Sequence, residues 1–225
     1  MEPRSAEERR AELVELYREA TVCARCPLSK TRTQVVFGAG NADADLMFVG
    51  EAPGMHEDRQ GLPFVGRAGQ LLNKLLEEIG LARDDVFIAN VLQSRPPGNR
   101  DPQLDEIDAC KPFLRRKIEL IEPKVVCTLG NFSTKLLTRS QRGITSVHGR
   151  PQVHELGGRL LRVYPLFHPA AALRSTNTLE ELRADFARLP ALLEEPPPVP
   201  IGAVAPVAAV AAVEPAGPAP PALFD

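Results

Sequence analysis

The stretch Asp45-Leu-Met-Phe-Val-Gly-Glu-Ala-Pro-Gly54 joins a short apolar run to a loop that holds two glycines and a carboxylate. The apolar run has the length and composition of a buried strand. Glu51 follows it directly, at the carboxyl end, where open α/β sheets bind their ligands. Gly50 and Gly54 permit a tight turn and close approach to a bound group, and Pro53 stiffens that turn. An ordinary strand-to-helix turn is the alternative, because so short a motif also occurs without a ligand.

A second glycine-punctuated loop, Gly61-Leu-Pro-Phe-Val-Gly-Arg-Ala-Gly69, follows closely and carries one aromatic ring, Phe64. Aromatic residues make up only 5% of the chain, so a ring inside such a loop draws attention to it. A carboxylate loop followed by an aromatic loop suggests a pocket for a flat, polar molecule. A buried core phenylalanine is the alternative interpretation.

Short apolar runs alternate with helical periodicity along the chain. The runs predict strands at 46–49, 86–90, 124–130 and 162–167. The periodic segments predict helices at 5–20, 68–79, 102–120, 133–138 and 179–193. The first helix is expected to begin at Ser5 with a capping box to Glu8. The third is expected to have a solvated face made of Lys111, Arg115, Arg116 and Lys117. This alternation predicts an α/β fold, with a parallel sheet covered by helices on both faces.

The chain has 225 residues, of which 44% are apolar and 25% charged, as in ordinary globular proteins. We expect residues 1–195 to form one domain, and residues 196–225, where Pro, Ala and Val dominate without periodicity, to form a disordered tail. No apolar run is long enough to cross a bilayer, and the charged N-terminus lacks a secretory apolar core. A cytoplasmic location is therefore expected.

The net charge of −2 argues against a strongly basic nucleic-acid binder. The charge is uneven, however. Residues 178–225 contain seven acidic and two basic residues, which leaves residues 1–177 with a net charge of +3. The stiff loop at 93–100 holds two prolines and two arginines and is suited to contact a phosphodiester. An exposed turn with solvated arginines is the alternative.

Four cysteines are present, and two of them form the C-x2-C turn Cys23-Ala-Arg-Cys26 ahead of a proline. Such a turn is typical of a metal site, an iron–sulfur cluster or a redox pair, although the redox motif normally follows a strand that is missing here. Cys110 and Cys127 complete the ligand count of zinc or of a cluster, but they are not spaced as a second knuckle. The alternative is that both are small buried hydrophobes.

Polar groups at the carboxyl ends of the predicted strands form a candidate pocket. Glu51, Asn90 and His168 each follow a strand. The ring of Phe64 is suited to stack on a nucleobase, and the Asn90 amide can read the O4 and N3–H edge of uracil, which cytosine does not present. The His168 imidazole can stabilise negative charge on uracil O2 as the glycosidic bond breaks. The Glu51 carboxylate can orient or deprotonate the water that attacks C1′.

The chain resembles the family 4 uracil-DNA glycosylases, the iron–sulfur type, over roughly residues 20–193. The resemblance rests on ordered motifs: CxRCPL from Cys23, GEAPG from Gly50, EDxxGxPFVGRAG from Glu57, NVxxxRPPGNRxP from Asn90, ACxPFL from Ala109, PKVVCxLG from Pro123 and HPAA from His168. It implies a three-layer αβα sandwich with a four-stranded parallel sheet. It also implies that the protein flips deoxyuridine out of DNA and hydrolyses its glycosidic bond, leaving an abasic site.

The same resemblance implies roles for individual residues. The catalytic residues are expected to be Glu51, near the attacking water, and His168, at the leaving base. The expected substrate contacts are Ala52, Glu57, Phe64, Asn90 and Asn99, with Glu57 near uracil C5 to exclude the thymine methyl group. A [4Fe–4S] cluster is expected on Cys23, Cys26, Cys110 and Cys127. DNA contacts are expected from Arg95, Arg100, Arg142, Leu173 and Arg174.

Two departures from the family pattern bear on function. Many relatives have Lys-Cys before the Arg-Pro-Pro, where this chain has Gln93-Ser94; we expect the change to remove a basic DNA contact and no cluster ligand. A related branch forms a covalent adduct through a histidine in this loop, but the chain has none there, and it has Ala52 where that branch has Gln. Ordinary turnover by a monofunctional glycosylase is therefore expected.

Two other classes of protein remain as alternatives, a non-catalytic nucleic-acid-binding module and a zinc-binding nucleotide hydrolase. The chain contains no Walker loop, H-E-x-x-H or G-x-S-x-G motif. We expect a monomer. The end of the tail, Leu223-Phe224, resembles short peptides that dock on the bacterial sliding clamp, with an inert tail as the alternative.

Overall fold

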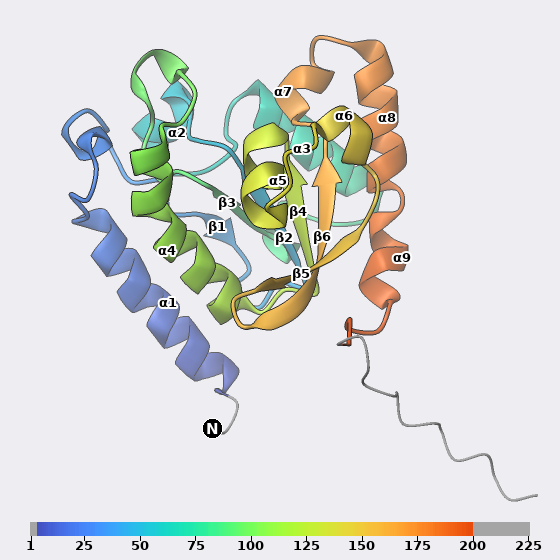
Figure 1. Cartoon of the computed structure of the whole chain (residues 1–225), viewed down its shortest axis with the longest axis horizontal. Helices are drawn as coiled ribbons and strands as arrows, with labels where there is room; N and C mark the ends of the chain where they lie inside the picture. Colours follow the sequence, from blue (N-terminus) through green and yellow to red (C-terminus); the bar gives the residue numbers. More distant parts are fainter. Residues whose placement is uncertain (1–3, 200–225) are drawn as a thin grey trace, which may run out of the picture.

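The computed structural model describes residues 4–199. They contain one six-stranded sheet with the strand order β1-β3-β2-β4-β6-β5 (Figure 1). The strands are β1 Ala39–Gly40, β2 Leu46–Gly50, β3 Phe87–Asn90, β4 Val125–Leu129, β5 Gln152–Leu156 and β6 Arg159–Leu166. The pairs β2–β3, β2–β4 and β4–β6 are parallel, whereas β1 and β5 pair antiparallel at the two edges. The predicted α/β class is confirmed, but the sheet has six strands, because the four predicted strands are extended by two antiparallel edges.

The edge strands lack the sequence signal that marked the central ones. β1 has only two residues. β5, Gln-Val-His-Glu-Leu, alternates between half-buried and exposed positions rather than forming an apolar run. It is joined to β6 by Gly157 and Gly158, both with positive φ, as a tight hairpin turn requires.

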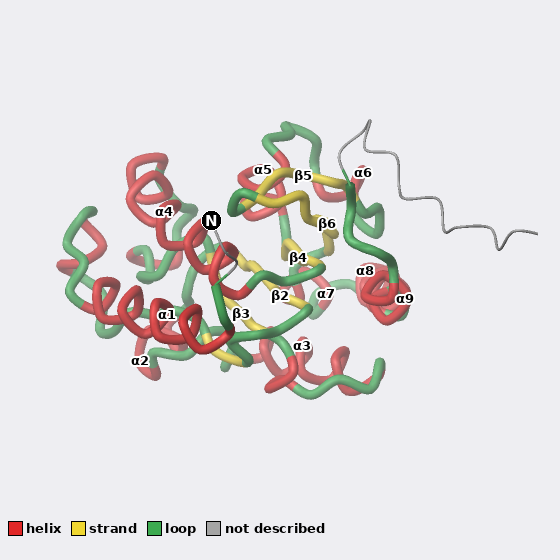
Figure 2. Tube along the Cα trace, turned by 90° about the horizontal axis from the view of Figure 1, so that it is seen from below, coloured by secondary structure: helices red, strands yellow, loops and turns green. Residues whose placement is uncertain are grey.

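Helices cover both faces of the sheet (Figure 2). They are α1 Ala6–Thr21, α2 Met55–Gln60, α3 Arg67–Glu78, α4 Leu104–Ile121, α5 Asn131–Thr138, α6 Ile144–Val147, α7 Pro169–Ala172, α8 Thr176–Phe186 and α9 Leu189–Glu194. The helix predicted at 179–193 is two helices, and α9 carries Pro190 in its first turn, where the missing N–H costs no helical hydrogen bond. No helix described between residues 4 and 199 is long and apolar enough to span a bilayer.

Alternating side chains of the strands build two separate apolar cores. Phe48 and Cys127 point to the face covered by α3, α8 and α9. Their neighbours Met47 and Val126 point to the face covered by α1 and α4. Because successive side chains of a strand lie on opposite faces, the sheet separates the two cores completely.

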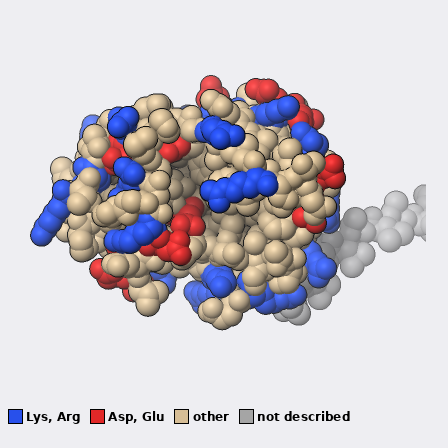
Figure 3. Space-filling model, turned by 90° about the horizontal axis from the view of Figure 1, so that it is seen from above, with Lys and Arg blue, Asp and Glu red and all other residues tan. Residues whose placement is uncertain are grey.

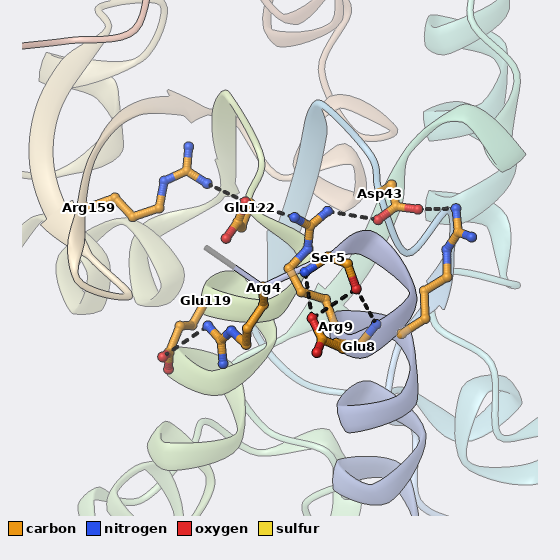
Figure 4. A network of polar contacts seen from close by, with 9 residues as sticks. Arg4, Ser5, Glu8, Arg9, Asp43, Glu119, Glu122 and Arg159 are labelled. Atoms are coloured by element: carbon orange, nitrogen blue, oxygen red, sulfur yellow. Dashed lines mark hydrogen bonds and ion pairs between the residues drawn. The ribbon is translucent and has the colours of Figure 1, made fainter. Parts of the chain in front are cut away.

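Ion pairs attach α1 to the far end of α4 and to the loop before β2 (Figure 4). Ser5 caps α1 in the predicted capping box with Glu8. The Arg9 guanidinium lies 3.0 Å from both Asp43 and Glu122. Since α1 leads directly into the C-x2-C turn, this attachment places that turn beside α4.

One charged residue of α4 is buried, and the prediction that it faces solvent is wrong. Lys117 is 0% exposed, because its position shares a helical face with Cys110 and Phe113 rather than with the exposed Lys111. Its ammonium donates to Gln93 Oε1 at 3.0 Å and to the Phe37 carbonyl, and it lies 4.2 Å above the Phe37 ring centroid. Burial lowers the pKa of Lys117 to about 7.

We predict that Phe48→Ala lowers the free energy of unfolding by about 3–5 kcal/mol, because it leaves a cavity in the core. Phe48 is 0% exposed, and its ring stacks on Phe186 with centroids 5.7 Å apart. The measurement is urea unfolding followed by circular dichroism. Leu104→Ala, at an 81% exposed position, is the control and should change stability by less than about 0.5 kcal/mol. Equal effects of the two variants would contradict this account of the core.

Candidate active site

The carboxyl ends of the parallel strands bring the predicted pocket residues together. Glu51 follows β2, Asn90 ends β3 and His168 follows β6. Gly50 and Asn90 are direct partners in the β2–β3 register. These ends surround a cavity of about 570 Å³. All seven predicted catalytic and substrate residues line it: Glu51, Ala52, Glu57, Phe64, Asn90, Asn99 and His168.

The Phe64 ring is held in the cavity by an unusual backbone. Phe64 has φ of 52°, in the left-handed region, and its ring lies 5.6 Å from the His168 ring at an interplanar angle of 30°. Two glycines make this possible. A Cβ on Gly69 would overlap the Phe64 carbonyl oxygen, and a Cβ on Gly50 would lie 2.7 Å from the ring. The glycines of both loops therefore serve the close packing of one aromatic ring.

The Asn90 amide is buried with an unused acceptor. Asn90 is 3% exposed, and its Oδ1 has no hydrogen-bond partner among residues 4–199. A Cβ on Gly50 would also overlap this oxygen, so the amide packs against bare backbone. Buried polar atoms without partners are rare, and each calls for an explanation. An unpartnered acceptor at the wall of a cavity is suited to take a hydrogen bond from a ligand.

His168 is neutral and has a defined tautomer. As N-cap of α7 it accepts a hydrogen bond at Nδ1 from the Ala170 backbone N–H at 3.1 Å. The ring proton is thereby assigned to Nε2. Burial lowers the pKa of His168 to about 4, so the ring is uncharged at neutral pH. It presents an N–H donor without placing a full positive charge in the cavity.

Glu51 is a half-buried carboxylate with a raised pKa. Burial is the main cause, and the like charge of Asp101 adds to it. Asp101 lines the same cavity, as do Pro96 and Ala170. None of these three was predicted as a site residue. Pro96 and Ala170 belong to the RPPGNR and HPAA motifs, and Asp101 is at an unspecified position of the motif that begins at Asn90, so only the fold shows that all three line the cavity.

Glu57 fixes the aromatic loop as well as lining the cavity. Its Oε1 accepts hydrogen bonds from the backbone N–H groups of Val65 and Gly66, each at 3.0 Å. Gly66 is the N-cap of α3. The carboxylate of α2 therefore compensates donors at the start of α3, next to Phe64.

The predicted DNA contacts fall into two groups. Arg100 lines the cavity but is bound to the buried Glu106 by two hydrogen bonds of 2.6 and 2.9 Å. Arg95 donates to Asn99 Oδ1 at 2.6 Å. The other three are exposed: Arg174 lines the cavity, whereas Leu173 and Arg142 do not. Seen from above, the surface is hollowed, with acidic side chains in and beside the hollow and Lys and Arg around it (Figure 3).

The cysteines do not form one group. Cys23 and Cys26 pack against the core of α1 and α4, which contains the buried Cys110. Cys127 lies in the core on the opposite face, beside Phe48 and Tyr164 in the register of β4. The expected four-cysteine cluster does not fit this geometry, because the sheet separates Cys127 from the other three thiols.

The remaining three thiols fit a polynuclear group better than a single ion. Within residues 4–199, no three His, Cys, Asp or Glu side chains lie close enough to hold one metal ion. A cluster carries its ligands on separate irons and needs wider spacing than the single-ion geometry of zinc. Burial raises the pKa of Cys110, and the nearby Cys26 and Cys23 add to the rise.

Comparison with known proteins agrees with the arrangement of the site. The model of the uracil DNA glycosylase superfamily matches residues 37–189. A type-4 uracil-DNA glycosylase of Thermotoga maritima is 47% identical over 176 residues, covering 77% of this chain and 89% of the relative. One of Sulfurisphaera tokodaii is 45% identical over 189 residues, covering 82% and 86%. A type-5 enzyme of Pyrobaculum aerophilum is 31% identical over 155 residues, covering 62% and 67%. The chain therefore belongs to the uracil-DNA glycosylase superfamily, and within it to the type-4 enzymes.

Proposed function

We propose that the chain excises uracil from DNA by hydrolysing the bond between uracil N1 and C1′ of deoxyribose. The observation that carries the proposal is the convergence of an aromatic ring, a buried amide, a neutral imidazole and a half-buried carboxylate on one cavity. The type-4 relatives support the same activity. A non-catalytic binding module would have no need for this combination.

Recognition of the base follows from Phe64 and Asn90. A flipped base leaves the duplex stack and regains stacking on the Phe64 ring. Asn90 Oδ1 accepts from uracil N3–H while its amide N–H donates to O4. Cytosine presents the opposite pattern along this edge and would leave buried polar groups mismatched, which a hydrogen-bonding pocket rejects strongly.

Bond cleavage follows from His168 and Glu51. As the glycosidic bond breaks, its electron pair moves to the uracil ring, and the His168 Nε2–H donates to the oxygen where negative charge grows. The sugar becomes oxocarbenium-like, and the Glu51 carboxylate stabilises it and orients the water that attacks C1′. Glu51 accepts the proton of that water and releases it to solvent, the departing uracil anion takes up a proton from solvent, and the products are free uracil and an abasic site.

We also propose an iron–sulfur cluster on the group formed by Cys23, Cys26 and Cys110, with a structural role. When bound, the cluster would tie the loop after α1 to α4. The assignment is supported by the type-4 relatives and by the common location of the three thiols. We propose a monofunctional enzyme, since no lysine lines the cavity within the described chain.

Three expectations from the sequence stay predictions: the monomeric state, the cytoplasmic location and docking of Leu223-Phe224 on a sliding clamp. Those two residues, like all of 200–225, lie outside the described residues. Deleting residues 196–225 and measuring clamp binding would test the last.

We predict that the purified chain releases free uracil from a uracil-containing duplex and that Asn90→Ala lowers the single-turnover rate at least about 100-fold. Affinity for abasic DNA, which lacks the base, should change much less. Asn177→Ala, at an exposed position of α8, is the matched control and should keep the wild-type rate. Binding without uracil release would contradict the proposed activity, and equal losses of rate and abasic affinity would contradict base reading by Asn90.

We predict that Asp101→Asn moves the acid limb of the excision rate to lower pH. Glu51 must be ionised to act on water, burial and Asp101 raise its pKa, and removing one charge lowers it again. His168, with a pKa of about 4, stays neutral through most of this range. The measurement is the single-turnover rate between about pH 4 and 8. The exposed Asp84→Asn serves as control, and an acid limb that stays in place in Asp101→Asn would overturn this assignment.

We predict that Arg174→Gln weakens DNA binding and lowers the slope of log affinity against log salt by about 1, as expected for one lost phosphate contact. Arg174 is exposed at the rim of the cavity. Arg18→Gln, on the exposed side of α1, is the control. The measurement is fluorescence anisotropy of labelled duplex at several salt concentrations. A salt slope identical to wild type would remove Arg174 from the DNA surface.

A further inference from the structure

A buried serine directly follows Gln93, whose backbone bonds to the Cys110 thiol. Ser94 is 3% exposed, and its Oγ accepts a hydrogen bond from Arg32 at 3.3 Å. The same guanidinium donates to the Cys23 carbonyl at 2.8 Å. The preceding residue, Gln93, bonds through its backbone to the Cys110 thiol. The loop after β3 therefore places Ser94 between the C-x2-C turn and α4.

Two cations at this place have only neutral acceptors. Lys117 is fully buried and donates to the Phe37 carbonyl and the Gln93 amide. Arg32 donates to Ser94 and to the carbonyls of Thr21 and Cys23. Neither forms an ion pair with a carboxylate of residues 4–199. A buried charge without a counterion is costly, so Lys117, together with the half-buried Arg32, points to an anionic group among the thiols.

We propose that Ser94 Oγ is the fourth ligand of the cluster, together with Cys23, Cys26 and Cys110, and that Cys127 is no ligand. The inference rests on the cluster proposed above. A cluster with four anionic ligands carries negative charge, which Lys117 and Arg32 would balance. On binding, the Ser94 hydroxyl loses its proton to solvent as the oxygen–iron bond forms, as metal ligands must.

The exchange of thiolate for alkoxide has a measurable consequence. Oxygen is a harder donor than sulfur and favours the more oxidised iron. Ser94→Cys should therefore keep the cluster and raise its reduction potential. Ser94→Ala should lose the iron at that corner and convert [4Fe–4S] to [3Fe–4S].

The experiment compares anaerobically purified full-length variants by iron and sulfide content, electron paramagnetic resonance and redox titration. We expect Cys127→Ala and the better-packing Cys127→Val to keep the wild-type iron content and spectrum. We expect Ser94→Ala to lose one Fe2+ and, after one-electron oxidation with ferricyanide, to show the signal of an oxidised three-iron cluster, with circular dichroism unchanged. Two Cys127 variants are used because a cavity in β4 alone could impair folding.

The outcomes separate the two proposals. Wild-type protein without iron and sulfide, also after anaerobic reconstitution, would contradict the cluster itself, whereas uracil release tests the catalytic proposal independently. A wild-type spectrum in Ser94→Ala, or loss of iron in both folded Cys127 variants, would overturn the ligand assignment alone.

Discussion

The site depends on close packing of two side chains against the bare backbone of Gly50. The Phe64 ring and the Asn90 amide both lie so close to Gly50 that a Cβ on this residue would overlap them. This contact is possible because parallel pairing sets Gly50 opposite Asn90. The ring is fixed from the other side by Gly69 and by the hydrogen bonds of Glu57. The shape of the cavity, which suits a flat base, thus follows from the β2–β3 register and from the glycines at positions 50 and 69, which have no Cβ.

Electrostatics inside the cavity follow from burial rather than from strong ion pairs. Burial keeps His168 neutral and raises the pKa of Glu51, so the cavity holds an uncharged imidazole donor beside the carboxyl groups of Glu51, Glu57 and Asp101. A neutral donor interacts weakly with uncharged uracil and more strongly as charge grows on its oxygen. In the proposed mechanism, the arrangement would therefore stabilise the transition state more than the bound substrate. Arg100 adds little free charge, because Glu106 already compensates it.

Much of the cavity could be predicted because each of its main residues follows an apolar strand in the sequence. Glu51, Asn90 and His168 carry this signal, and the glycines mark the Phe64 loop. Cys127 and Lys117 were misplaced for a different reason: which side of a strand or helix a residue faces depends on the neighbouring layers. Cys127 points away from the other thiols because one residue of strand register decides the face. Asp101 and the edge strands gave no local signal at all.

The loop at 91–100 connects the two parts of the protein that the sheet separates. Val91 and Leu92 bond to the backbone of Gly50 and Glu51, each at 3.0 Å. The side chain of the next residue, Gln93, accepts a hydrogen bond from the Lys117 ammonium, and its backbone bonds to the Cys110 thiol. Ser94 follows directly. Two residues later, Pro96 already lines the cavity. The three thiols therefore support one wall of the cavity through a short, proline-stiffened segment, so the proposed cluster would act on catalysis by fixing the position of this wall and without entering the chemistry.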